Sequence, residues 1–195
     1  MNPNSPMRRF DPRKVAHLEK ENYVAYYQKD WLKLLRVSVG LVKESFGLNL
    51  WQAIYGAYLV ARAEIAFAPF PDNDVPRAQA YMQRFYQFIR KVHHEVFDIE
   101  HVAQLEVNWW IVHRQLFANP NNQELVEALA NAYAIAYGVR PEQVRQAAYH
   151  RAMGMLLSDQ WVNDGREANS SLLEREEEEL VKAYTELRQA VQVAR

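Results

Sequence analysis

Apolar residues recur along almost the whole chain at spacings of three and four, which is the period of an amphipathic α-helix. No stretch shows the strict alternation of apolar and polar residues that is typical of a strand. Prolines, glycines and capping residues divide the pattern into segments joined by short connections. We therefore predict an all-α fold, a single-domain bundle of about seven mostly antiparallel helices over residues 1–195, with residues 1–10 as an N-terminal tail.

Local signals place most helix boundaries. Asp11 followed by Pro12 is typical of a helix start, and this first helix is expected to extend, with or without a break near Asn22, as far as Gly47. Asn49 with Gln52 three residues later resembles a capping box. The remaining helices are expected over residues 50–68, about 75–96, 98 to about 117, a short segment ending near 138, 141–165, and from 171 onward.

The segment from Leu50 to Ala68 is apolar on every side, yet it carries Arg62 and Glu64. A helix of this kind is normally enclosed by other helices. Charges inside such an enclosure must find partners or shift their pKa values. The sequence thus predicts a buried polar cluster in an aromatic core, and we expect a binding or scaffolding domain.

A small-molecule pocket is one interpretation of this cluster. Bundle interiors can hold a ligand where aromatic walls surround a few polar groups. Helical spacing brings Glu106, Trp110 and His113 to one side of the segment 98–117, next to Trp109. The residues predicted to bind a ligand are Arg62, Glu64, Trp109, Trp110 and His113.

A metal site is the alternative, which would make the protein a metal-dependent oxidoreductase. Mixed carboxylate and imidazole ligands hold iron or manganese inside helical bundles. Glu106 and His113 are seven residues apart, about 10.5 Å along a helix, so other helices must supply ligands. The predicted metal ligands are Glu64, His93, Glu106 and His113. The Glu-x-x-His motif of ferritin-like di-metal proteins does not occur in the chain.

Residues 130–151 suggest a third function. Ala134, Gly138 and Val144 are spaced as in a helix-turn-helix motif, and Arg145 at the start of the second helix would face DNA together with Gln143 and Gln146. Any two packed helices joined by such a turn give the same spacing. The surrounding residues are not basic, so we favour a structural helix pair over a nucleic acid partner and keep a helix-turn-helix DNA-binding protein as an alternative.

Composition narrows the class of protein. The chain has no cysteine, which excludes disulfides and thiolate ligands and is typical of a cytoplasmic protein. Its apolar segments are too interrupted to predict a membrane span. The first fifty residues carry nine Lys/Arg and five Asp/Glu, whereas residues 151–195 carry six and nine, respectively. Such polarity favours pairing between copies, and we expect a homodimer. The acidic run at 174–179 is expected to form a solvated helix face or to dock a basic partner.

Overall fold

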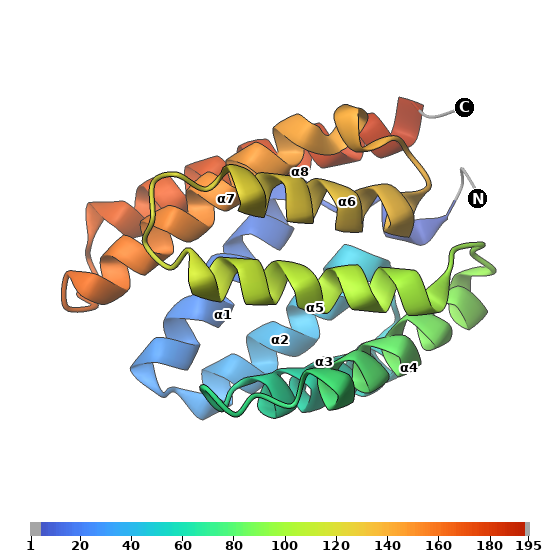
Figure 1. Ribbon diagram of the computed structural model, residues 1–195, viewed down its shortest axis with the longest axis horizontal. Coiled ribbons are helices and arrows are strands. Elements are labelled where there is room, and N and C mark those ends of the chain that lie inside the picture. The colour runs from blue at the N-terminus through green and yellow to red at the C-terminus, as the bar shows by residue number, and fades with distance from the viewer. Residues whose placement is uncertain (1–4, 194–195) are drawn as a thin grey trace.

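The computed structural model describes residues 5–193, and this part of the chain forms eight α-helices, one 3₁₀ turn and no strand (Figure 1). The prediction of an all-α bundle is confirmed. No helix in this range is long and apolar enough to cross a membrane. The elements are η1 (Pro6–Arg8), α1 (Pro12–Gln28), α2 (Trp31–Phe46), α3 (Leu50–Phe67), α4 (Val75–His93), α5 (Ile99–Gln115), α6 (Gln123–Tyr137), α7 (Pro141–Asn163) and α8 (Ser171–Val193).

The capping signals of the sequence operate as predicted. Asn49 and Gln52 form a complete capping box at the start of α3. The carboxylate of Asp98 accepts a hydrogen bond from the backbone N–H of His101 at the start of α5. Gly47 and Gly138 end α2 and α6 in the left-handed conformation, which glycine adopts without steric cost.

The first predicted helix is in fact two helices, which is why the structure has one helix more than expected. The chain turns at Lys29, whose φ of 59° lies in the left-handed region. Asp30 then starts α2, since its carboxylate accepts from the backbone N–H of Lys33. The break therefore falls at Lys29 and not near Asn22. No glycine marks this position in the sequence, because a lysine makes the turn.

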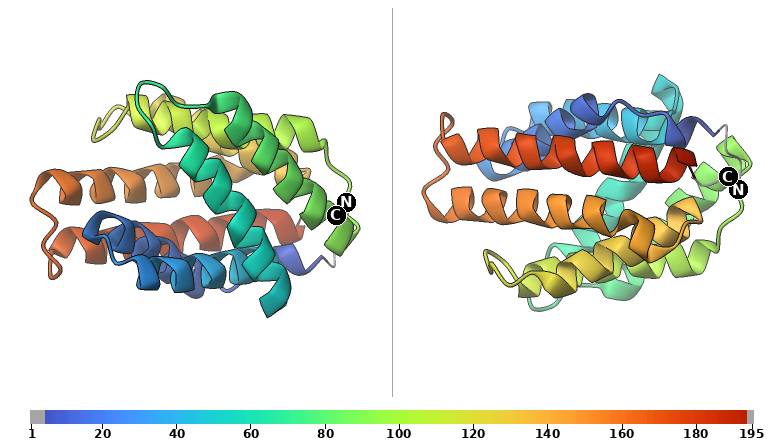
Figure 2. Two further views of the ribbon diagram at one scale, coloured as in Figure 1. Left: turned by 90° about the horizontal axis from the view of Figure 1, so that it is seen from below. Right: turned by 90° about the horizontal axis from the view of Figure 1, so that it is seen from above.

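The helices are arranged in a ring. Each helix packs against the next along the chain, and α8 returns to pack against α1, which closes the ring. Figure 2 shows α7, α8 and α1 side by side in the view from above, whereas α3 crosses the opposite side obliquely in the view from below. The main apolar core lies between these helices, and a smaller cluster around Trp161 lies between α1, α7 and the start of α8.

The segment before α1 is packed against the ring and is not a loose tail from residue 5 onward. Met7 and Phe10 are buried in the main core. Arg8 is also buried, and its Nη1 and Nη2 donate to the carbonyl oxygens of Val191 at 2.9 Å and Tyr137 at 2.7 Å. The predicted tail of residues 1–10 is thus wrong for residues 5–10, and residues 1–4 lie outside the described part.

The prediction that other helices enclose α3 is wrong. The face of α3 that packs on its neighbours consists mostly of small residues, among them Ala53, Gly56 and Ala57. Large residues lie on the opposite face, where Trp51 is 79% and Ile65 is 66% exposed. The helix is therefore apolar on all sides and covered only on its inner side.

Candidate functional site

A network of polar and aromatic side chains lies inside the ring, and seven of the eight helices contribute to it. We call it the interior polar network. It has two halves, which meet where the guanidinium of Arg151 lies over the ring of Trp109 at 4.8 Å. Its members are Glu19 on α1, Glu64 on α3, Tyr86 on α4, Glu106 and Trp109 on α5, Tyr133 on α6, Arg151 on α7 and Tyr184 on α8.

The first half is the ion pair between Arg151 and Glu19, and each of these side chains also forms a hydrogen bond with a tyrosine hydroxyl. Arg151 donates from Nε to Glu19 Oε1 at 2.9 Å, and its Nη2 lies 2.8 Å from the same oxygen. Its Nη1 donates to the hydroxyl of Tyr133 at 3.2 Å, and Tyr184 donates to the second oxygen of Glu19. Burial raises the pKa of Tyr133 to about 12, so this hydroxyl stays protonated. The charge of Glu19 is balanced within the protein.

The second half centres on the carboxylate of Glu106. Tyr86 donates to Oε2 at 2.8 Å, and the indole N–H of Trp109 donates to Oε1 at 2.9 Å. Burial, and then the charge of Glu106, raise the pKa of Tyr86, which keeps its hydroxyl a donor. Both oxygens of Glu106 are hydrogen-bonded, but neither donor carries a positive charge.

Glu64 is the member without a partner. No hydrogen bond or ion pair joins its side chain to another described residue. Burial among the helices, and then the nearby carboxylate of Glu106, raise the pKa of Glu64 to about 7. The side chain is nevertheless exposed to solvent, contrary to the enclosure predicted from the sequence. Water contact weakens the effect of burial, but the repulsion from Glu106 acts in the same direction.

Only part of the predicted ligand set comes together. Glu64 and Trp109 belong to the interior polar network, and Trp110 packs edge-on against Trp109 with ring centroids 6.1 Å apart. Arg62 is instead turned toward α4, where its guanidinium lies 4.9 Å from the centre of the Tyr81 ring. His113 lies instead against the carboxylate of Asp159 on α7.

Asp159 on α7 is a second polar centre, which the sequence analysis missed. Its carboxylate is buried, with 1% of the residue exposed. It accepts from the hydroxyl of Tyr23 at 2.8 Å and from the backbone N–H of Ala118 at 3.0 Å, and it lies 3.1 Å from Nε2 of His113. The signal was an acidic residue in the stretch 155–162, whose other residues are apolar except for Ser158 and Gln160. Glu19 and Arg151 lie in polar stretches that give no such signal.

The four predicted metal ligands do not converge. His93 Nε2 donates to the carbonyl oxygen of Phe46 at 2.7 Å, and His113 is held by Asp159. Only Glu64 and Glu106 are close enough to influence each other. Within residues 5–193, no group of three or more histidine or acidic side chains is arranged to hold a metal ion. The predicted iron or manganese site is therefore wrong, because its histidines face other partners.

The segment 130–151 is a packed helix pair. Ala134 and Val144 are buried, and α6 and α7 run side by side (Figure 1). The side chains proposed to contact DNA have partners within the chain. Gln143 accepts from the backbone N–H of Arg140, Arg145 lies 3.5 Å from Glu127, and Gln146 bonds to His150. These contacts favour the structural interpretation of the motif.

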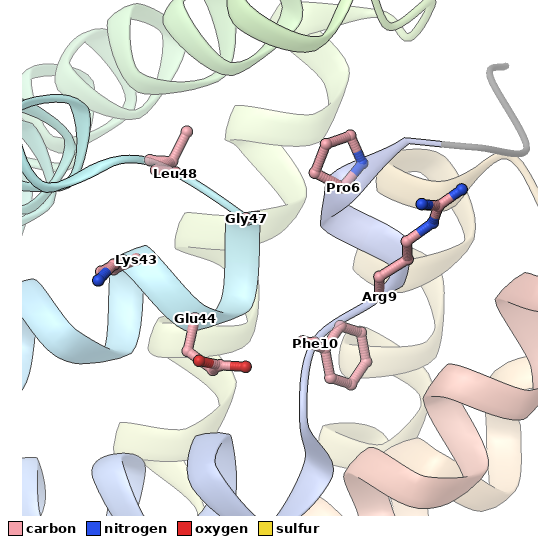
Figure 3. Close-up of a pocket in the computed structure, with 7 residues that line it drawn as sticks. All are labelled: Pro6, Arg9, Phe10, Lys43, Glu44, Gly47 and Leu48. Carbon is pink, nitrogen blue, oxygen red and sulfur yellow. The ribbon is translucent and has the colours of Figure 1, made fainter.

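Two surface pockets lie away from the interior polar network. One, of about 310 Å³, separates the N-terminal segment from the end of α2, and Figure 3 shows its seven lining residues. Among them, the carboxylate of Glu44 already accepts a hydrogen bond from the backbone N–H of Asp11. The other, of about 210 Å³, lies beside Arg62 at the end of α3. Neither pocket contains a carboxylate of the interior network.

Comparison with protein-family models, curated proteins and solved structures gives no match to this chain. Its function is therefore inferred from the geometry of its residues.

Proposed function

We propose that this protein binds a small organic cation on its helical ring, with the solvent-exposed carboxylate of Glu64 as the counter-ion. The observation that carries this proposal is that Glu64 is an accessible acid with no partner, next to a second acid, Glu106. An acid whose pKa is raised by a neighbouring charge is a candidate for a functional site.

The balance of charge favours a cation over an anion. Arg151 neutralises Glu19, whereas the donors to Glu106 are a phenol and an indole. When Glu64 is ionised, its charge is repelled by that of Glu106, which Arg151 attracts more weakly than it attracts Glu19. An ammonium or guanidinium group would relieve this repulsion, and an anionic ligand would increase it.

The aromatic residues favour a ligand that also has an apolar body. Trp109 and Trp110 stand edge to face, and Trp110 packs on Phe67 with centroids 5.6 Å apart. Indole rings attract cations through their faces and cover apolar groups at the same time. One face of Trp109 is already occupied by Arg151, so the ligand would contact the neighbouring ring surfaces. An arylalkylamine has the required chemistry.

Isothermal titration calorimetry with benzylamine tests the proposal, with butylamine and guanidinium as further probes. Benzylamine is expected to bind the wild-type protein, whereas benzoate is expected not to bind. Affinity should rise as the pH increases through about 7, because Glu64 ionises while the amine stays protonated. Glu64→Gln should reduce the affinity at least tenfold, which corresponds to about 1.4 kcal/mol.

Glu178→Gln is the matched control, since Glu178 is an exposed acid on α8 that does not belong to the interior polar network. This variant should bind benzylamine as the wild type does. The proposal fails if none of the three cations binds, if benzoate binds as well as benzylamine, or if Glu64→Gln retains full affinity.

A further inference from the structure

The outer face of α3 carries large apolar side chains that nothing in the described chain covers. Within the part of the chain that the structure describes, fourteen large hydrophobic residues are exposed, and nine of them lie on α2 and α3. On α3 they occupy about 140° of the helix circumference, given 100° per residue. The nine are Trp31, Leu32, Leu35, Leu50, Trp51, Ile54, Tyr55, Tyr58 and Ile65.

The spacing of these residues is that of a helix-to-helix contact. Trp51, Ile54, Tyr58, Ala61 and Ile65 follow one another at intervals of three, four, three and four residues. We call them the α3 seam. This is the pattern by which one helix packs its side chains into another along a coiled-coil seam. All five are at least partly accessible, so the partner of the seam is not another helix of the described chain.

The centre and the two ends of the α3 seam are matched to each other. Trp51 precedes Tyr58 by seven residues, and Ile65 follows it by seven. An antiparallel helix related by a twofold axis at Tyr58 would therefore place Trp51 against Ile65 of the second copy. In the same arrangement Tyr55 meets Ala61, a large residue against a small one. Ile54 meets Arg62, whose Nη1 donates to the hydroxyl of Tyr58 at 3.0 Å and whose guanidinium also lies 4.9 Å from the centre of the Tyr81 ring on α4.

From this geometry we infer that α3 is the interface of a homodimer, in which the α3 seams of two copies pack antiparallel about Tyr58. The exposed area suffices for such a contact. A stable dimer buries about 800 Å² per partner, and each buried aromatic side chain supplies roughly 150–250 Å². Because Trp51 is 79% exposed and Tyr55 and Tyr58 are 49% and 50% exposed, these three supply roughly 270–450 Å², and the aliphatic residues of the same face add to it. This inference does not depend on the proposed ligand.

Sedimentation velocity of the full chain, from nanomolar to high micromolar concentration, should show a reversible dimer. Tyr58→Glu would bring two like charges together at the axis and is expected to give a monomer with unchanged helix content by circular dichroism. Val96→Glu is the control, because Val96 is 74% exposed but lies in the connection between α4 and α5. It should leave the dimer intact.

Cysteine cross-linking tests the register directly, since the chain contains no cysteine. Tyr58→Cys should be linked between copies by a short bismaleimide. Trp51→Cys should not, because its two copies would lie about 21 Å apart along the helix axis, the length of fourteen residues. Val96→Cys should give no cross-link either.

Three results would overturn the inference. The first is a wild-type protein that stays monomeric at all concentrations. This result would stand against the dimer also if the monomer bound phosphatidylcholine or phosphatidylserine vesicles in a flotation assay. The second is a dimer that survives Tyr58→Glu. The third is cross-linking through Trp51→Cys but not through Tyr58→Cys, which would exclude the antiparallel register.

Discussion

α3 and α8 have opposite compositions and opposite surroundings. α3 is one of the most apolar segments of the chain, yet its buried face is made mainly of alanine and glycine, and its large residues are exposed. α8 begins with an acidic run, yet it buries Leu180, Leu187 and even Glu176. Average hydrophobicity therefore does not decide burial. The neighbours decide it, because α8 packs between α7 and α1, whereas α3 has cover on one side only.

The acidic run itself illustrates the difference. We expected a solvated face or a dock for a basic partner. Glu176 is instead 2% exposed, and Glu177 and Glu179 form ion pairs with Lys20 and Lys182. Only part of the run faces water freely, so it offers less charge to a partner than the sequence suggests.

The largest contrast should appear between Trp161, which lies on α7 and packs against Leu173 of α8, and Trp51 on α3. Trp161→Ala is expected to destabilise the protein by about 3–5 kcal/mol, because the side chain is fully buried and donates to the carbonyl oxygen of Glu167. Trp51→Ala should change the stability of the monomer by less than about 0.5 kcal/mol. Urea unfolding at low protein concentration measures both. Equal losses in the two variants would contradict the contrast.

The ion pairs should give the next largest contrast. Arg151→Met leaves Glu19 without its counter-ion and is expected to cost about 3 kcal/mol, the lower end of the range for buried pairs, since both side chains retain some exposure. Arg145→Met breaks the exposed contact with Glu127 and should cost less than about 1 kcal/mol. The same urea titrations decide this prediction. A small loss in Arg151→Met would mean that water already screens the interior pair.

The smallest effect depends on pH. Burial raises the pKa of Glu176 to about 8, and its Oε2 has no hydrogen-bond partner. A raised pKa means that the protonated form is favoured by folding. The stabilising contribution is therefore complete below the ordinary pKa of about 4.5 and is lost as the pH rises through about 8.

Glu176→Gln should thus stabilise the protein at pH 9 relative to the wild type, by roughly 1–3 kcal/mol. The two proteins should converge near pH 4. Thermal unfolding across this range, with Glu178→Gln as an exposed control, provides the measurement. A difference that does not vary with pH would show that Glu176 does not titrate as the structure implies.

The sequence analysis could single out a residue as a candidate where its local pattern set it apart. Glu64 was recognised because it interrupts an apolar helix, and Trp109 because it lies on an apolar stripe. Glu19 and Arg151 could not be recognised, because they come from segments in which charges are common. Their pairing joins positions 132 residues apart, and no local pattern encodes such a contact.

The sequence alone determined the class of fold and most helix ends, because caps, prolines and glycines act on the backbone within a few residues. It also determined that α3 would be apolar. Only the tertiary structure decided that α3 lies at the edge of the ring, that His93 and His113 turn to separate partners, and that Glu64 remains unpaired. These outcomes depend on which helices meet in space, and packing between distant segments fixes that choice.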